Sequence, residues 1–158
     1  FGYSSRLDNL QAVIANIRLG DLEKGNNIRR EIAKRYHDGL QGLPLLLPMA
    51  QSLKTTCCTT SSLCDCITHC KKRYDVYNSY VVRSKDRDSL YQFLRDNGVE
   101  VFTHIHKPLT KYNLLSLGNF SLSNNERICG EILSLPIYPQ LEIEKVDYVV
   151  SKIVEFYQ

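Results

Sequence analysis

The chain has 158 residues, a length typical of one domain. Its 20 lysines and arginines against 17 aspartates and glutamates give a net charge of +3, which is too small to indicate a nucleic-acid-binding surface. Hydrophobic residues make up 43% and charged residues 23%, which excludes a disordered chain. No apolar run approaches the roughly 18–20 residues of a membrane span, and the first residues do not resemble a signal peptide. We therefore expect a cytoplasmic protein that contacts neither nucleic acid nor membrane.

Apolar residues recur at three- and four-residue steps through the first 40 residues and predict helix there. The first set is Leu7, Leu10, Ile14 and Ile17, and the second is Ile28, Ile32, Tyr36 and Leu40. Gly20 and Gly25 lie between the two sets, and each weakens a helix by about 1 kcal/mol relative to alanine. The region is therefore either one long helix with a weak centre or two helices end to end. It stops at three helix breakers, Gly39, Gly42 and Pro44. Residues 1–42 are expected to be one long helical segment.

Residues 43–158 alternate between expected strands and helices. Strands are expected at 45–47, 77–84 and 99–103. Helices are expected from Asp86 to Asn97-Gly98, from Ser121 or Ser123 to just before Pro136, and from about Glu142 to Tyr157. The second of these helices carries Ile132 and Leu133 on its apolar face. This order predicts a small α/β (α+β) domain, in which a long N-terminal helix accompanies a small sheet covered by helices.

Residues 49–72 show no usable periodicity and have an unusual Thr/Cys-rich composition, which predicts an insertion in the domain. Four potential zinc ligands fall within it, namely Cys64, Cys66, His69 and Cys70. Zinc modules normally use two ligand pairs separated by a longer loop, whereas this segment offers a single tract. A poorly ordered loop is therefore the favoured interpretation, and a Cys/His metal-binding module is the weaker alternative.

Several segments together resemble one protein family. The opening Gly2–Ala12 is similar to the signature G-x-N-S-R-L-D-x-x-Q-A of the pyridoxal-phosphate-dependent sugar aminotransferases of the DegT/DnrJ/EryC1/StrS group. Further matches, in the same order along the chain, are Tyr74–Arg83, Asn97–Glu100, His104 with Lys107–Leu109, and Ser134–Pro139. The resemblance covers nearly all of the chain outside residues 49–72. Within the family, the chain looks most like enzymes that aminate the 3-keto group of a nucleotide-linked deoxysugar.

The resemblance implies the small C-terminal domain of a fold-type I aminotransferase, which transfers an amino group from glutamate to a nucleotide-linked keto-sugar and acts as a homodimer. The family's Schiff-base lysine lies in a larger N-terminal domain, in segments that precede the matched region. The lysines of this chain occur in none of that context, so by itself it is expected to contain no catalytic residue and to be inactive. Residues 1–42 would bridge to the missing large domain. The alternative is a non-catalytic interaction or dimerisation module.

The resemblance also implies four binding residues. Ser4 stands where the family has an asparagine that bonds the cofactor phosphate, although a serine at this place is equally suited to cap a helix. Arg6 can pair with a phosphate or a substrate acid, or else with nearby Asp8. His104 falls where the family places a histidine facing the sugar nucleotide, and Lys107 can meet the substrate diphosphate.

A domain separated from its larger partner exposes the apolar surface that packs there. We expect one face of the first helix to be such a surface, and the isolated chain to self-associate.

Overall fold

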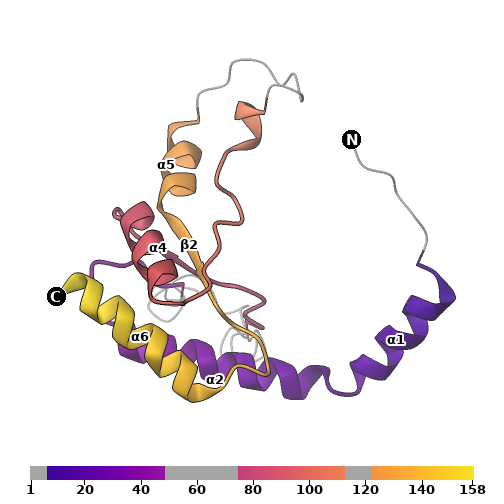
Figure 1. Cartoon of the computed structure of the whole chain (residues 1–158). Coiled ribbons are helices and arrows are strands. Elements are labelled where there is room, and N and C mark those ends of the chain that lie inside the picture. Colours follow the sequence, from indigo (N-terminus) through magenta and orange to yellow (C-terminus); the bar gives the residue numbers. More distant parts are fainter. Residues whose placement is uncertain (1–6, 49–74, 113–121) are drawn as a thin grey trace, which may run out of the picture.

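The computed structural model describes residues 7–48, 75–112 and 122–158, and it shows a mixed α/β domain (Figure 1). In chain order its elements are α1 (Asn9–Leu19), α2 (Leu22–Leu40), β1 (Tyr80–Arg83), α4 (Arg87–Asp96), the short 3-10 helix η1 (Leu109–Lys111), α5 (Ser123–Glu131), β2 (Ile132–Leu135) and α6 (Ile143–Tyr157). The expected class, a small sheet accompanied by helices, is confirmed. The insertion predicted at 49–72, with its four potential zinc ligands, lies outside the described residues.

Residues 9–40 form two helices end to end, which decides between the two alternatives left open by the sequence. Asp8 caps α1, because its carboxylate accepts a hydrogen bond of 2.7 Å from the backbone N–H of Gln11. This helix therefore does not need Ser4 as its cap. The chain leaves α1 at Gly20 and enters α2 at Leu22, whereas Gly25 is tolerated inside α2.

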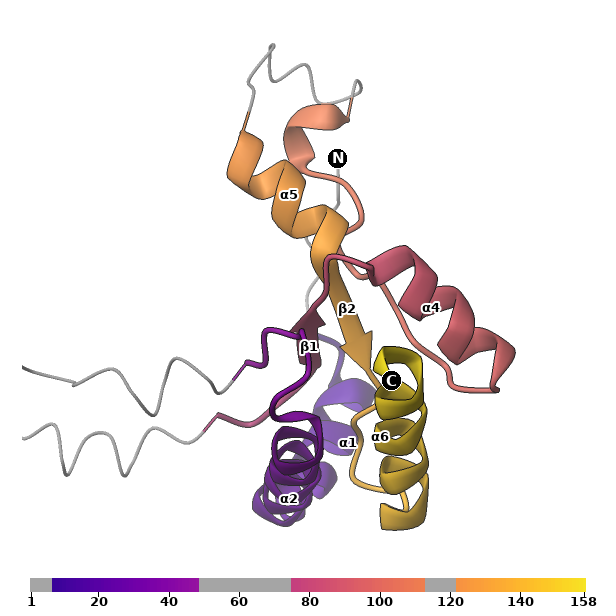
Figure 2. The ribbon, with the colours of Figure 1, turned by 90° about the vertical axis from the view of Figure 1, so that its left-hand side faces the viewer.

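The sheet consists of β1 and β2, which pair antiparallel with Tyr80 opposite Leu135 and Arg83 opposite Ile132. Single bridges extend it on both sides: Leu46 pairs with Arg83, and Phe102 pairs with Ser134. The strands expected at 45–47 and 99–103 are therefore wrong as full strands, since each contributes one bridge. Figure 2 shows β1 and β2 above α2 and α6, with α4 on one side.

The predicted end of one helix is also wrong. The helix expected to continue to just before Pro136 ends at Glu131, and Ile132 and Leu133 lie in β2. The apolar spacing fits a helix face, but Leu133 is fully buried opposite Val82 of β1. Pairing with a distant strand outweighs the local helical pattern here.

The core forms where α2, α6, α4 and the sheet meet. Its largest fully buried side chains include Tyr36, Ile32 and Leu40 from α2, Tyr80 and Val82 from β1, Leu90 and Leu94 from α4, and Val146 and Ile153 from α6. Polar contacts fix α2 in place: the Tyr36 hydroxyl donates to the Pro136 carbonyl at 2.9 Å, and Arg35 forms a two-pronged ion pair with Asp147 of α6. The ion pair holds α6 along α2 (Figure 2), and the tyrosine bond ties α2 to the segment that follows β2.

Helix α1 lies apart from this core and extends away from the rest of the domain (Figure 1). None of its residues is buried. Its apolar residues and the preceding Leu7 are widely exposed: Leu7 67%, Leu10 72%, Val13 55%, Ile14 45% and Ile17 72%. We call these five residues the α1 apolar face. The expected exposure of this face is confirmed. Among the described helices, none is long and apolar enough to cross a membrane.

Candidate functional site

A cavity of about 590 Å3 lies at the edge of the sheet. It is bounded by the chain after α4, by the segment that follows β2, and by the first half of α6. This volume falls within the range of small-molecule sites, roughly 300–1,000 Å3. Most of the exposed lining surface is apolar, and the polar residues among it include Glu100, His104, Ser134 and Lys145. A largely apolar cavity with a few polar groups is the usual form of a ligand site.

The sheet positions His104 in this cavity. Phe102 is held by two backbone hydrogen bonds with Ser134 of β2, one of 3.2 Å from the Phe102 N–H and one of 2.8 Å from the Ser134 N–H. Two residues further on, the His104 ring stacks on the Phe102 ring, with centroids 5.9 Å apart and planes at 19°. The histidine singled out by the resemblance therefore lines the cavity, and its binding role remains a proposal.

The structure does not bring Lys107 to the same place. Its ammonium lies over the ring of Tyr112, 5.2 Å from the centroid, and the residue does not line the cavity. Ser4 and Arg6 lie outside the described residues, so their expected contacts with the cofactor phosphate stay predictions. Within the described ranges, no three histidine, cysteine or acidic side chains are grouped in a way that could hold a metal ion.

Among the lining residues, only His104 was singled out as a site residue from the sequence, and those that were missed include Tyr138, Lys145 and Tyr148. The Lys145 ammonium donates to Glu142 at 3.0 Å, and this hydrogen bond raises the pKa of the lysine. The Tyr148 hydroxyl donates to the backbone carbonyl of Asn97 at 2.9 Å. Lys145 and Tyr148 have a helical spacing on α6. The sequence carries no signal that α6 returns beside the loop after α4.

The described lysines do not fit the Schiff-base role of the pyridoxal phosphate chemistry. A lysine that forms a Schiff base is activated by an apolar pocket or a neighbouring cation. Lys145 lines the cavity, but its side chain is 64% exposed and is paired with a carboxylate. Of the other lysines in the described ranges, only Lys152 is partly buried, and it donates to Glu155 at 2.8 Å. The described part of the chain therefore shows no site for the covalent step.

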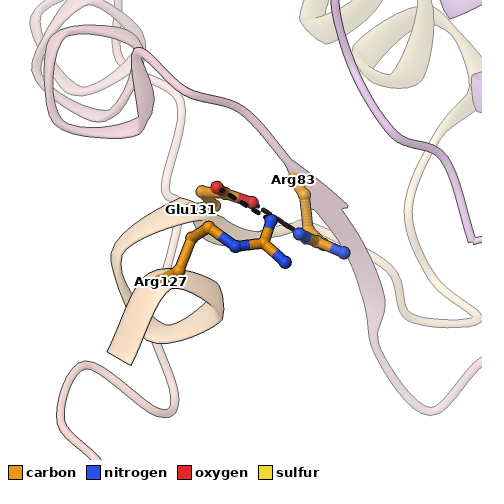
Figure 3. Close-up of polar contacts among 3 residues, drawn as sticks. All are labelled: Arg83, Arg127 and Glu131. Carbon is orange, nitrogen blue, oxygen red and sulfur yellow. Dashed lines mark hydrogen bonds and ion pairs between the residues drawn. The ribbon is translucent and has the colours of Figure 1, made fainter. Parts of the chain in front are cut away.

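A second cavity, of about 440 Å3, lies beside a cluster of three charged residues (Figure 3). Glu131 Oε2 accepts from Arg83 Nη2 at 2.6 Å and from Arg83 Nε at 3.2 Å, and Glu131 Oε1 accepts from Arg127 Nη1 at 3.4 Å. The hydrogen bond from Arg83 is the main reason that the pKa of the Glu131 carboxyl is lowered. Because the two guanidinium groups share this one carboxylate, the cluster ties the end of α5 to β1.

Comparison with known proteins identifies the family. The sequence model of the DegT/DnrJ/EryC1/StrS aminotransferase family matches residues 1–154. The chain is 31% identical over 163 residues to a "pleiotropic regulatory protein" of Geobacillus stearothermophilus, covering 99% of this chain and 39% of that protein. It is 34% identical over 163 residues to a dTDP-3-amino-3,4,6-trideoxy-alpha-D-glucose transaminase of Micromonospora megalomicea, covering 98% of this chain and 38% of that protein.

A solved structure gives the same result. DesV of S. venezuelae, crystallised with a ketimine intermediate, superimposes with a TM-score of 0.78 at 30% identity, covering 99% of this chain and 38% of DesV. The chain thus spans less than two fifths of the length of these relatives. The family expected from the sequence motifs is confirmed by sequence and by fold. The chain belongs to the DegT/DnrJ/EryC1/StrS aminotransferase family.

Proposed function

We propose that this chain is the C-terminal part of a pyridoxal-phosphate-dependent enzyme that transfers an amino group from glutamate to a nucleotide-linked keto-sugar. The family match over residues 1–154 supports the reaction class, and relatives named as dTDP-sugar transaminases support the substrate class. The enzyme would act in the cytoplasm as a homodimer, as the family resemblance implies. When bound, pyridoxal phosphate supplies the electron sink of the transamination.

His104 is the observation that carries the proposed substrate site. It reaches the cavity from the sheet edge, at the position where the family resemblance expects a histidine facing the sugar nucleotide. A neutral imidazole both donates and accepts hydrogen bonds, so it suits the hydroxyl groups of a sugar. Ser4 and Arg6 would contact the cofactor phosphate of the partner subunit, and Lys107 would meet the substrate diphosphate.

The α1 apolar face would carry the contact with the large domain. The relatives are more than twice as long as this chain, so the family fold includes a further portion that the chain does not span. Four exposed apolar side chains on an 11-residue helix, together with Leu7 just before it, are typical of a surface that another part of a protein covers. This same face supports the second candidate function, an interaction module that dimerises without catalysis.

The test compares the chain alone with a protein that also contains the large domain. Pyridoxal phosphate is added to each, and borohydride traps any Schiff base on a lysine. We expect no trapped lysine in the chain alone. In the longer protein we expect trapping, together with conversion of glutamate to 2-oxoglutarate when a dTDP-3-keto-deoxysugar is present. A longer protein that binds no cofactor and forms no 2-oxoglutarate would favour the interaction module.

A matched pair of variants tests His104. Replacing His104 with glutamine is expected to raise the KM for the sugar nucleotide and to leave the KM for glutamate unchanged. His106 is also exposed but does not line the cavity, so H106Q is the control and should change neither constant. Equal effects of the two substitutions would remove His104 from the substrate site.

A further inference from the structure

The second cavity lies at the opposite edge of the sheet from the cavity at His104. Across the sheet the order is Leu46, β1, β2 and Phe102. Leu46 and Arg83 line the second cavity, whereas Phe102 and Ser134 line the first, and the two cavities share no lining residue. The volume of the second cavity, about 440 Å3, is also within the range of small-molecule sites.

An apolar segment forms part of its lining. Residues 43–46, with the sequence Leu-Pro-Leu-Leu, all line the cavity, and Leu46 is 54% exposed. The backbone of Leu46 is fixed to β1, because its N–H donates to the Arg83 carbonyl at 2.9 Å and its carbonyl accepts from the Arg83 N–H at 3.0 Å. The segment therefore offers a held apolar surface, and a ligand with an apolar part gains free energy by covering it.

Charged side chains complete the lining. Arg83, Lys85 and Arg127 are positive, and Asp86 and Glu131 are negative, so one positive charge is in excess. Lys85 is exposed and makes no ion pair with a described residue. An excess of one positive charge suits a ligand with a single negative charge, whereas a doubly charged phosphate would leave the site negative.

Glu131 holds two guanidinium groups together beside the cavity (Figure 3). Arg83 donates to it through Nε and Nη2, and Arg127 donates only through Nη1, at the long distance of 3.4 Å. A guanidinium has five N–H donors, so each arginine keeps donors that no described residue accepts from. The planar arrangement of these donors matches a carboxylate. The two arginines can therefore share a second carboxylate.

We propose that the second cavity binds a small organic carboxylate, whose charged end accepts from Arg83 and Arg127 and whose apolar part covers Leu43–Leu46. Lys85 adds a further positive charge that attracts such an anion. The inference is independent of the proposed function, because it involves neither the cavity at His104 nor the cofactor.

The experiment titrates the 15N-labelled 158-residue chain with five compounds and follows its amide NMR signals. The compounds are acetate, butanoate, hexanoate, the uncharged hexanamide and inorganic phosphate. Hexanoate is expected to bind most tightly, because each added methylene that becomes buried strengthens binding by up to about fourfold. The signals that shift should be those of residues 43–46, 83–86 and 127–131. Added salt should weaken the binding of hexanoate but not that of hexanamide.

Arg127→Gln tests the charged side of the cavity. It should weaken acetate and hexanoate binding alike, by about two- to fivefold, since Arg127 is partly exposed. The matched control is Arg95→Gln, which removes the same charge from an exposed position of α4 that does not line the cavity and should change neither affinity. The NMR spectrum of each variant shows whether it is folded. Lys85→Gln replaces Arg127→Gln if that variant is not.

Leu46→Ala tests the apolar side. The backbone bridge to Arg83 is kept, so the substitution should weaken hexanoate binding by about three- to tenfold and leave acetate binding unchanged. Leu109→Ala is its control, because Leu109 is 68% exposed and does not line the cavity.

Three results would overturn the inference. The first is hexanoate binding no tighter than that of acetate, hexanamide or phosphate. The second is a set of shifted signals that lies outside the lining of the second cavity. The third is hexanoate binding that neither Arg127→Gln nor Leu46→Ala weakens. None of these results bears on transamination, which the experiment with the large domain tests separately.

Discussion

The rings of Tyr36 and Tyr80 pack together in the core with centroids 5.1 Å apart and planes tilted by 38°. They join α2 to β1, and both residues are fully buried. Their hydroxyl groups differ, however. The Tyr36 hydroxyl donates to the Pro136 carbonyl at 2.9 Å, whereas the Tyr80 hydroxyl has no hydrogen-bond partner among the described residues. The Tyr36 hydroxyl thus stabilises the core, whereas the buried and unpartnered Tyr80 hydroxyl destabilises it.

This difference predicts opposite effects of the same substitution. Tyr36→Phe should lower the free energy of unfolding by about 0.5–1.5 kcal/mol, because it removes a hydrogen bond and leaves the Pro136 carbonyl without it. Tyr80→Phe should raise the free energy of unfolding by about 1 kcal/mol, because it removes a buried hydroxyl that has no partner. Urea denaturation of the two variants measures both values. Equal losses in the two variants would show that the Tyr80 hydroxyl is bonded in solution.

Alkaline pH should destabilise the domain through the same pair. Burial raises the pKa of both phenols above the ordinary value of about 10, so the folded chain holds these protons more tightly than the unfolded chain. Their contribution to stability is therefore complete below pH 10 and is lost progressively as the pH rises further. Urea denaturation at a series of pH values measures this loss. In the double variant Tyr36→Phe/Tyr80→Phe, the free energy of unfolding should fall less steeply as the pH rises. Ionisation of both phenols near pH 10 without unfolding, followed by tyrosinate absorbance, would contradict this prediction.

Local patterns in the sequence sufficed for much of the fold. The helices α2, α4 and α6 follow from their apolar periodicity, and Gly98, with a φ of +74°, follows α4 as the Asn97-Gly98 pair predicts. Gly39 is an exception, because it was expected to stop the helix and instead lies inside α2. Its role concerns packing against α6, which only the folded arrangement reveals.

Elements that depend on distant partners could not be predicted in the same way. Strand β2 follows α5 without a break. The local apolar spacing assigns Leu133 to a helix, and only its pairing with Val82, 51 positions earlier, makes it part of a strand. In the candidate site, the family resemblance singled out His104. Tyr148 and Lys145 required knowledge that α6 lies beside the chain after α4, and no local signal carries that information.

Acid pH should weaken the tie between α5 and β1. Hydrogen bonding from Arg83 lowers the pKa of the Glu131 carboxyl, so the ion pair contributes to stability above the ordinary value of about 4.5 and is lost as the pH falls through the lower folded-state value. Glu131→Gln should remove this part of the acid sensitivity. Urea denaturation between pH 3 and pH 6 measures the free energy of unfolding of both proteins and so gives this acid sensitivity.

The matched control is Asp147→Asn, because Arg35 lowers the pKa of that carboxyl in the same way. The Asp147 side chain is 46% exposed and that of Glu131 only 16%, so added salt should screen the Arg35 pair more strongly. An equal response of the two variants to salt would contradict the partial burial of the Glu131 cluster.

Gly39 sets how closely α2 approaches α6. A Cβ atom built on Gly39 would lie 2.6 Å from Val150 Cγ1 and 3.3 Å from Cγ2, and valine has little rotamer freedom in a helix. Gly39→Ala should therefore destabilise the domain by about 1–3 kcal/mol, although alanine is the better helix former. Gly130→Ala in α5 is the control. Its Cβ would meet nothing within 4 Å, so it should stabilise the domain by up to about 1 kcal/mol.

The second variant that tests this contact is Val150→Ala. On its own it should be mildly destabilising, because it removes partly buried methyl groups. Combined with Gly39→Ala it should recover much of the loss caused by the glycine substitution, since the new methyl group then fills the space that the valine leaves. Thermal unfolding of the four proteins gives the coupling energy between the two positions. Strict additivity would mean that α2 and α6 separate to admit the alanine, and that Gly39 does not set their distance.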